Sequence, residues 1–404
     1  MFILKAAFCR AFQTAFRLAL PILPYREPEI IGSLGDLPGI LQQEKRRHAL
    51  IVTDAGIVRS GLTAPLEDVL QNQGIACTVY HGTQPNPTVR NVEDALALYR
   101  ECGCDCLIAI GGGSAMDCAK GVGARLAHPK KTVSQMKGVL RVWRKLPTLI
   151  AIPTTAGTGS EVTLAAVITD GERHDKYALM SFPLIPHYAV LDAALTVSLP
   201  PALTAATGMD ALTHAVEAYI GRSTTRETRR LALEAARLVF SNVEQAFRDG
   251  KNLGARRNML HAAYKAGAAF SKSYVGYIHA IAHALGGQYG TPHGLANAVI
   301  MPCVLEAYGA SAHRKLHELG TAAGVCSAED SHRAGAEKFI RAIRSMNERM
   351  GIPARLQGIR PEDVPALARH AEREANPLYP VPRLMTAGEL EVIIHQIAER
   401  SEKP

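Results

Sequence analysis

The sequence is poor in aromatic residues. Only 5% of its 404 residues are Phe, Trp or Tyr, and Trp143 is the single tryptophan. Surfaces that bind nucleic acid by base stacking are built from aromatic side chains, so the composition argues against nucleic acid as a partner. The 45 Lys and Arg residues, which give a formal net charge of +8, are spread along the chain and form no cluster. A mildly basic protein that binds an anionic cofactor is the simpler interpretation of this charge.

The N-terminus lacks an uninterrupted apolar run. Arg10 and Arg17 break the stretch MFILKAAFCRAFQTAFRLALPILP, so it offers neither a signal-peptide core nor a span of about 20 apolar residues. Phe8, Phe12 and Phe16 recur at helical spacing and predict an amphipathic helix within an N-terminal extension, residues 1–24. We expect this helix to pack on its own protein or on a partner subunit, with contact to a membrane surface as the less favoured alternative.

Eight cysteines are too few and too scattered for a disulfide framework. Cys102, Cys104 and Cys106 alternate at the entry to an apolar strand, but no matching Cys or His set follows closely. The spacing therefore favours a structural role over a metal cluster. Unpaired cysteines are typical of a reducing compartment, so we predict a cytoplasmic location.

The length and the change of pattern along the chain predict two domains. Apolar strands are expected at 48–53, 106–110, 148–152 and 188–191, and a further strand is expected to end at residue 80. Helices such as 88–101 and 114–127 lie between several of these strands. Strands that are apolar throughout and alternate with helices indicate a parallel sheet covered on both faces. After SLPPALTAATG, residues 198–208, strand patterns disappear and helical periodicity continues to about residue 400. We therefore predict an α/β domain over 25–199 and an all-helical domain over 200–404.

Three consecutive glycines, Gly111, Gly112 and Gly113, follow one of these strands and precede a helix. Glycines let the backbone approach a diphosphate closely, and the start of a helix supplies free N–H groups and a positive dipole end. The loop is neither a Walker A motif nor a G-x-G-x-x-G fingerprint. It predicts a phosphate-binding loop for a dinucleotide.

Polar residues at the ends of two other strands extend this prediction. Asp54 ends the first strand, where a carboxylate can bind ribose hydroxyls, although a role in a turn is as consistent with the residue alone. Thr154, Thr155 and Thr158 lie in PTTAGTGSEVT, residues 153–163, and are candidates for the same crevice.

The second half of the chain carries the residues typical of a metal site. Asp210 and His214 are four residues apart on one predicted helix, and so are His279 and His283 on another. Gly286-Gly287 is expected to end the second helix, and Thr291-Pro292 to begin the next, with His293 just inside it. The pattern lacks the glutamate of HExxH, which argues against a zinc protease. One Asp with two or three His suits Fe²⁺ or Zn²⁺.

Four stretches together resemble the iron-containing (group III) alcohol dehydrogenase family: GGGSAMDCAK, PTTAGTGSEVT, TAATGMDALTHAVEAY and HAIAHALGGQYGTPHGLANAVI. The resemblance covers about residues 30–400 and implies a dinucleotide-binding domain, a helical domain and a metal in the cleft between them. It implies that the metal ligands are Asp210, His214, His279 and His293, and that His283 is a neighbour of the nicotinamide. The cofactor positions that it implies are Asp54, Asn86, Gly112, Gly113, Ser114, Asp117, Thr154, Thr155, Thr158 and Lys176.

The predicted reaction is reversible hydride transfer between a primary or secondary alcohol and a nicotinamide cofactor. Because Asp54 would repel a 2′-phosphate, NAD is expected over NADP. Fe²⁺ is expected as the metal with Zn²⁺ as the alternative, His283 as a route for the alcohol proton, and a homodimer or larger homo-oligomer as the assembly. Alternative functions are a glycerol dehydrogenase-like or 3-dehydroquinate synthase-like metal and NAD enzyme, a metal-dependent hydrolase, and a non-catalytic NAD-binding or membrane-surface protein.

Overall fold

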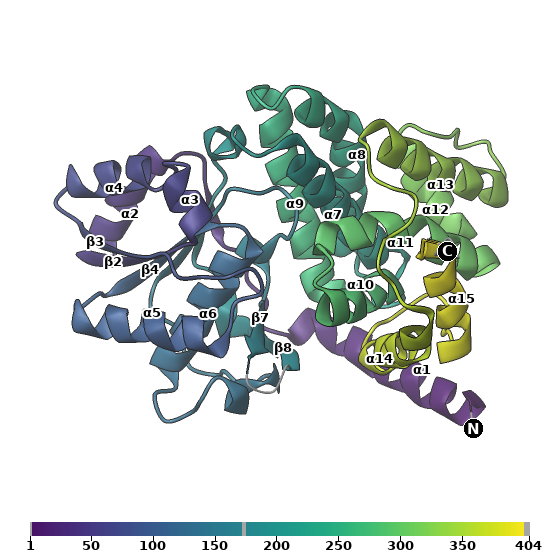
Figure 1. Ribbon diagram of the computed structural model, residues 1–404, viewed down its shortest axis with the longest axis horizontal. Helices are drawn as coiled ribbons and strands as arrows, with labels where there is room; N and C mark the ends of the chain where they lie inside the picture. The colour runs from purple at the N-terminus through teal and green to yellow at the C-terminus, as the bar shows by residue number, and fades with distance from the viewer. Residues whose placement is uncertain (1, 172–174, 400–404) are drawn as a thin grey trace. The chain divides into compact units, whose positions relative to one another are not determined.

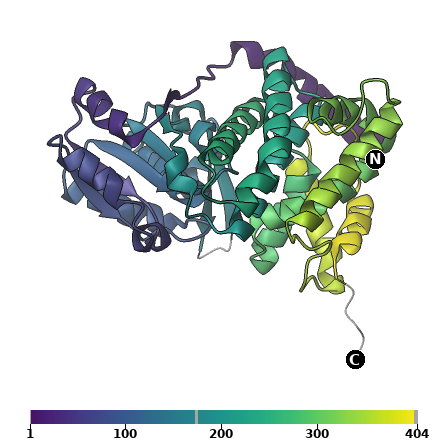
Figure 2. The same ribbon diagram turned by 90° about the horizontal axis from the view of Figure 1, so that it is seen from above.

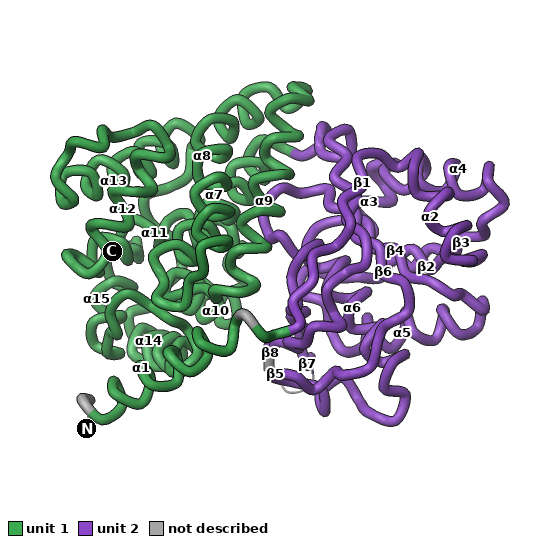
Figure 3. Tube along the Cα trace, turned by 180° about the vertical axis from the view of Figure 1, so that it is seen from behind, with its two compact units in different colours: residues 1–23, 200–404 green, residues 24–199 purple. Residues whose placement is uncertain are grey.

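A computed structural model of the protein describes residues 2–171 and 175–399. The chain forms two compact units, which Figure 3 shows in different colours. One comprises residues 24–199, and the other comprises residues 1–23 together with 200–404. The first is an α/β unit and the second is helical, so the predicted fold class is confirmed.

The α/β unit is built on a six-stranded sheet with the order β1-β9-β6-β4-β2-β3, in which every pair is parallel. The strands are β1 (Glu29–Ile31), β2 (His48–Val52), β3 (Ala76–Tyr80), β4 (Cys106–Gly111), β6 (Leu149–Pro153) and β9 (Tyr188–Val190). Five of the six coincide with the strands expected from the sequence. The remaining one, β1, was not predicted, because three residues are too few to show a period.

Both faces of this sheet are covered by helices (Figure 1). Leu50 and Val52 of β2 point into a core shared with α5 (Val89–Glu101) and α6 (Gly113–Ala127). Ala49 and Ile51 point into the opposite core, which they share with α2 (Leu37–Gln43) and α4 (Ala64–Gln71). Alternate residues of one strand thus enter different cores, which explains why these strands are apolar throughout. The short helix α3 (Ala55–Arg59) follows β2.

A second sheet in the same unit was not expected. It has three strands in the order β5-β8-β7, comprising β5 (Gly138–Val139), β7 (Ala165–Asp170) and β8 (Asp175–Met180). Strands β7 and β8 are antiparallel, with Ala165 opposite Met180. Threonine, aspartate and lysine interrupt the apolar pattern in these strands, so their sequence does not stand out from a loop.

The other unit is built of helices, with an isolated β-bridge between Leu356 and Ala398 and no strand among its described residues (Figure 2). Its helices are α1 (Phe2–Ala19), α7 (Pro201–Ile220), α8 (Arg226–Arg248), α9 (Leu253–Ser273), α10 (Tyr277–Tyr289), α11 (His293–Tyr308), α12 (His313–Ala322), α13 (His332–Arg349), α14 (Val364–Ala375) and α15 (Ala387–Ile397). Local sequence sets several of their starts. Thr225 begins α8 and Thr386 begins α15, each through a capping box in which its side chain accepts the backbone N–H three residues later.

Two expected helix boundaries were wrong. Gly286 and Gly287 lie inside α10, which continues to Tyr289 and ends at Gly290 in the left-handed conformation. Glycine tolerates a helix interior at a cost of about 1 kcal/mol, and only Gly290 has the positive φ of 67° that ends a helix. Pro292, not Thr291, precedes the first residue of α11, and it provides no side-chain cap.

The N-terminal helix α1 packs through a mixed face that includes the buried Cys9 and the partly buried Phe16, whose ring contacts that of Tyr274. Arg10 donates to the carbonyl oxygens of Val381 and Pro382, and the Gln13 amide donates to those of Pro377 and Tyr379. Its apolar side is turned outward, with Leu4, Phe8, Phe12 and Leu18 all exposed. Among the described residues, no helix combines the length and hydropathy that crossing a bilayer requires.

Candidate functional site

Three helices bring the proposed metal ligands together. Asp210 lies on α7, His279 on α10 and His293 at the first residue of α11. One ligand atom from each lies within 4.8 Å of the others. Asp210 and His279 are almost fully buried, whereas His293 is partly exposed. Three of the four predicted ligands, which lie 69 and 14 positions apart in the sequence, thus meet at one point.

The spacing of these atoms fits a single ion. Asp210 Oδ1 is 3.5 Å from His293 Nε2 and 3.8 Å from His279 Nε2. Two ligands at about 2.1 Å from one tetrahedral ion are roughly 3.4 Å apart. The Asn297 amide shows that all three atoms face the same point, because its Nδ2 lies 2.7 Å from Asp210 Oδ1, 3.1 Å from His293 Nε2 and 3.3 Å from His279 Nε2. A cation would meet the same three acceptors.

A buried carboxylate that the sequence analysis missed orients His279. Glu217 lies on α7 and its Oε2 is 2.6 Å from His279 Nδ1, while its Oε1 accepts the backbone N–H of Ile278. A histidine that donates from Nδ1 to a carboxylate presents the lone pair of Nε2, and this is the usual arrangement behind a metal ligand. Glu217 follows Asp210 and His214 on the same face of α7, at the spacing i, i+4, i+7, which was the signal that the sequence contained.

Burial keeps this histidine uncharged. Removal from water lowers the pKa of His279 well below its usual value, and the neighbouring His214, His293 and His283 lower it further. An uncharged imidazole is the form that binds a metal, so the electrostatics agree with the geometry.

The fourth predicted ligand, His214, lies beside the other three and not among them. Its ring stacks on Phe270 with centroids 4.2 Å apart and on His279 at 4.4 Å. Its Nδ1 is 4.0 Å from Asp210 Oδ1. The structure therefore places His214 at the edge of the three-residue group.

His283 is one turn beyond His279 on α10, and a carboxylate also holds its Nδ1. Glu374 of α14 lies 2.6 Å from this atom, and the Tyr379 hydroxyl donates to the same carboxylate oxygen at 2.8 Å. The His283 ring stacks on His293 with centroids 5.2 Å apart. Its Nδ1 is thus occupied, and Nε2 is the nitrogen left to exchange a proton.

Gly111 and Gly113 of the glycine loop in the α/β unit have little room for a side chain, whereas Gly112 has ordinary van der Waals space. Gly111 has φ of 146°, and a Cβ there would lie 3.0 Å from Cβ of Ala115. A Cβ on Gly113 would lie 3.0 Å from the Thr158 side chain, and one on Gly112 3.6 Å from Thr155. Gly113 is the first residue of α6, followed by Ser114. The structure thus brings the glycines together with two of the three predicted threonines. Thr154 adjoins them through a backbone bond from its N–H to Gly111 O.

The other predicted cofactor residues differ in what their side chains bind within the protein. Asp54 caps α3 by accepting from the N–H groups of Gly56 and Ile57, and its Oδ2 faces Gly111, 3.7 Å from where a Cβ would stand. Lys176 donates to the Asn86 side chain at 2.7 Å. Asp117, in contrast, uses both carboxylate oxygens on its own protein, accepting from Ser160 Oγ and from Val167 N–H.

Sequence analysis also missed a buried lysine in α6. Lys120 is fully buried, and its ammonium donates to Ser160, Thr163 and Ala165 at 2.7 to 3.0 Å. It therefore fixes the segment that follows the glycine-contacting Thr158. Glu161 in this segment is 1% exposed, and burial raises its pKa to about 7.

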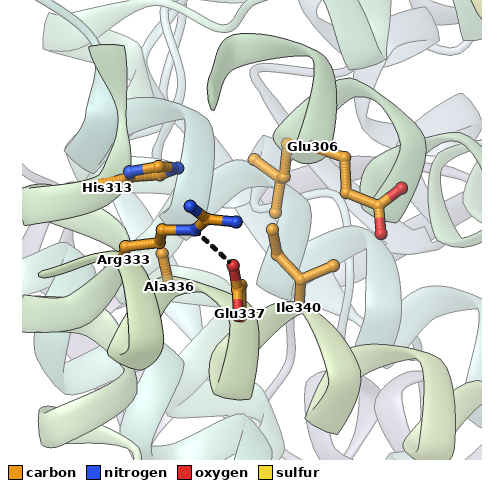
Figure 4. Close-up of a pocket in the computed structure, with 7 residues that line it drawn as sticks. Glu306, His313, Arg333, Ala336, Glu337 and Ile340 are labelled. Atoms are coloured by element: carbon orange, nitrogen blue, oxygen red, sulfur yellow. Dashed lines mark hydrogen bonds and ion pairs between the residues drawn. The ribbon is translucent and has the colours of Figure 1, made fainter. Parts of the chain in front are cut away.

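A cavity of about 230 Å³ on the helical unit lies at other residues (Figure 4). Its lining consists of Leu305, Glu306, His313, Arg333, Ala336, Glu337 and Ile340. None of these is a predicted site residue, and Arg333 and Glu337 in the lining pair with each other at 2.8 Å. We do not assign the chemistry to this cavity.

Comparison with known proteins identifies the family of the chain. The family model described as iron-containing alcohol dehydrogenase matches residues 30–193, and that of the Fe-containing alcohol dehydrogenase family, C-terminal, matches residues 204–398. The chain is 37% identical to 1,3-propanediol dehydrogenase of Klebsiella pneumoniae, over 94% of this chain and 98% of that protein. It is 34% identical to NAD-dependent methanol dehydrogenase of Bacillus methanolicus, over 84% and 90%.

A solved structure shares the fold over almost its whole length. The crystal structure of a 1,3-propanediol oxidoreductase superposes with a TM-score of 0.89 at 36% identity, and the match covers 92% of this chain and 99% of that one. The metal-ligand geometry, the glycine loop and these matches lead to one conclusion: the chain belongs to the iron-containing alcohol dehydrogenase family and is a metal-dependent alcohol dehydrogenase that uses a nicotinamide cofactor.

Proposed function

We propose that the protein interconverts a small primary or secondary alcohol and its carbonyl compound, with Fe²⁺ held by Asp210, His214, His279 and His293. The observation that carries this proposal is the convergence of three ligand atoms on the Asn297 amide, with Glu217 behind His279. The similar proteins named for propanediol and methanol support a small alcohol as the substrate. Zn²⁺ is the alternative metal, because the same donor types suit it.

The chain's own residues would carry the proton. When bound, the metal supplies a Lewis acid for the substrate oxygen and the nicotinamide supplies the hydride acceptor. We infer that His283 Nε2 receives the alcohol proton, because Glu374 holds the proton of the other ring nitrogen at Nδ1. The carboxylate also stabilises the imidazolium that results. Tyr379 keeps Glu374 in place through its hydroxyl.

We propose that the glycine loop binds the cofactor diphosphate. Residues 24–199 would then form the nucleotide-binding domain, and residues 200–404 the metal-binding domain. The residues proposed to bind the cofactor are Asp54, Asn86, Gly111, Gly112, Gly113, Ser114, Asp117, Thr154, Thr155, Thr158 and Lys176. For Asp117 the structure favours a supporting role, because both its oxygens accept bonds from the protein.

Asp54 gives the cofactor proposal a direct test. Its carboxylate faces the glycine loop, where it would accept from ribose hydroxyls and repel a 2′-phosphate. We expect the wild type to prefer NAD and the Asp54→Gly variant to use NADP better, as measured by kcat/KM for both cofactors. A wild type that already prefers NADP would contradict this assignment.

The reaction itself is tested on protein purified without oxygen. Metal analysis should give Fe²⁺ close to one per chain. Incubation with NAD and a panel of alcohols that includes propane-1,3-diol and methanol should raise the absorbance of NADH. Loss of the metal to a chelator should abolish the signal, and Fe²⁺ should restore it. Metal-loaded protein that reduces no NAD with any alcohol of the panel would contradict the proposal.

We also propose a cytoplasmic enzyme that forms a homodimer or a larger homo-oligomer. The eight cysteines, all of them free thiols, support a reducing compartment. The outward apolar side of α1 supports an assembly of subunits.

A further inference from the structure

Contrary to the even spread of Lys and Arg expected from the sequence, one surface segment of the α/β unit is strongly basic. Residues 128–147 include Lys130, Lys131, Lys137, Arg141, Arg144 and Lys145 and contain no aspartate or glutamate. All of these cations except Lys131 are exposed. Strand β5 lies in the middle of the segment (labelled in Figure 3). The nucleotide site and the metal site use none of these residues.

Bulky apolar side chains are exposed among these cations. Val139, Leu140 and Trp143 have exposed fractions of 47%, 54% and 64%. Three such side chains within five residues are unusual on a surface that faces only water, where large apolar groups occur singly. Trp143 is also the single tryptophan of the chain.

The exposure is imposed by the fold and does not come from a loose loop. Leu140 N–H donates to Met180 O at 2.7 Å, Val142 N–H to Ser181 Oγ at 3.1 Å and Trp143 N–H to His128 Nε2 at 3.2 Å. Val142 between them is buried. Leu140 has a φ of 58°, which is strained for a leucine. A strained, exposed leucine that an adjacent bond holds in place indicates a side chain displayed for contact.

The cations and the apolar groups form one surface. The Arg144 guanidinium lies 4.8 Å from the centre of the Trp143 ring, and Lys131 Nζ donates to Arg141 O at 3.3 Å. The imidazole of His128 contacts the Trp143 ring edge to face, with centroids 5.0 Å apart. A carboxylate borders the segment, since Ser134 Oγ donates to Asp170 at 3.5 Å. We call the exposed side chains of residues 137–145, together with Lys130, the basic apolar surface.

We propose that the basic apolar surface docks this enzyme on an anionic lipid membrane. Lysine and arginine are attracted to the negative potential of anionic headgroups, and each contributes a factor of about five to binding. Tryptophan prefers the headgroup level, and Leu140 and Val139 would enter the adjoining acyl region. The enzyme would thus bind peripherally, which goes beyond its proposed reaction and does not depend on it.

Other occupants fit the surface less well. A second copy docked through the same surface by a two-fold axis would bring five exposed cations against five others. Nucleic acid would match the charge, but it gains nothing from exposed Val139 and Leu140, and single-strand binding uses several stacked aromatics. The combination of aliphatic groups and cations is what selects a lipid surface.

The single tryptophan gives a site-specific reporter. Vesicles of phosphatidylcholine with phosphatidylglycerol should shift the emission of Trp143 to the blue, and vesicles of phosphatidylcholine alone should not. The shift should weaken as salt rises, because screening acts on the cations. The N-terminal helix also exposes apolar side chains, so vesicle co-sedimentation without a Trp143 shift would place the contact elsewhere and overturn the proposal.

Two variants and a matched control complete the test. The triple variant Lys130→Gln, Arg141→Gln, Lys145→Gln should lower vesicle affinity about a hundredfold, from three factors of about five. The control Lys45→Gln, Arg47→Gln, Arg100→Gln removes three exposed cations elsewhere on the same unit and should retain most of the affinity. Leu140→Gly relieves the positive φ and should keep the fold while reducing the blue shift.

Three further results would overturn the proposal. The first is equal loss of affinity in the triple variant and the control, and the second is an unchanged shift in Leu140→Gly. The third is a Trp143 shift that arises with RNA or on raising the protein concentration, and not with anionic vesicles.

Discussion

Glu161 is the residue whose burial has the clearest consequence for pH. It is 1% exposed, its Oε1 has no hydrogen-bond partner among the described residues, and burial raises its pKa from 4.5 to about 7. The folded protein therefore holds this proton where the unfolded chain has lost it. The resulting stabilisation is complete below about pH 4.5 and is lost as the pH rises to about 7.

The variant Glu161→Gln tests this direction of the pH dependence of stability. Glutamine cannot lose a proton, so the variant should gain stability relative to the wild type between pH 5 and pH 8, by roughly 3 kcal/mol at most. The free energy of unfolding of both metal-free proteins, measured with denaturant at pH 5 and at pH 8, gives this difference in stability. A difference between the two proteins that stays constant with pH would show that Glu161 is ionised throughout.

The chemical roles of residues were predictable from the sequence where the residues belong to a recognisable motif. Asp210, His279 and His293 were identified from spacing and resemblance, and the structure brings them together. Glu217 and Glu374 were not identified, because each acts through a histidine that is distant in sequence, and Asn297 was not identified, because it contacts Asp210 and His279 from another helix. Their roles depend on how α7, α10, α11 and α14 pack, which local periodicity does not specify.

At the scale of elements, the metal group depends on the close approach of α11 to α7. A Cβ on Gly294 would lie 2.4 Å from the backbone oxygen of Ala206, so this glycine lets α11 reach α7. Gly294 follows His293 directly and precedes Asn297 by three residues. A wider separation of α11 from α7 would move both His293 and Asn297 away from Asp210.

We therefore expect Gly294→Ala to destabilise the protein by about 1–3 kcal/mol and to weaken metal binding. Gly287→Ala is a matched control, because Gly287 lies inside α10 and has no atoms within 4 Å of its Cβ position. The Gly287→Ala control should keep its metal, and its free energy of unfolding should rise by about 0.5–1 kcal/mol. Melting temperature and metal content of both variants decide this, and a Gly294→Ala variant that retains full metal would show that α11 does not need the close approach.

Strands were predictable where burial leaves a recognisable apolar pattern in the sequence. Strands β2, β4 and β6 are apolar along their length because both faces are covered. Strands β7 and β8 were missed because residues such as Thr169 and Lys176 break the pattern. The end of α10 was misplaced because the Gly286-Gly287 pair resembles a helix stop, whereas the backbone changes direction at Gly290.

At the scale of the whole molecule, the assembly is the next prediction. The mixed face of α1 binds the segment 377–382, and its apolar side presents Leu4, Phe8, Phe12 and Leu18. We expect light scattering to give at least twice the chain mass of 43.4 kDa. Phe8→Ser with Phe12→Ser should lower that mass if α1 forms the contact, and a wild-type mass of one chain would contradict the assembly.

The fold class followed from one change of pattern, near Pro200, where strands give way to helices. The sequence alone did not show that residues 1–23 belong to the helical unit. That contact is made by Arg10 and Gln13 with backbone carbonyls of residues 377–382, and backbone acceptors carry no side-chain signal.

The most direct test of the central claim is the metal content of three histidine variants. His279 and His283 share a face of α10, but His279 Nε2 points at the Asn297 amide with Asp210, while His283 is held by Glu374. His279→Ala and His293→Ala should lose metal and activity together. His283→Ala should keep nearly one metal per chain and lose turnover, by about 10²–10⁴-fold if it is a full general base. A metal-free His283→Ala protein beside a loaded His279→Ala protein would reverse the roles assigned to the two histidines.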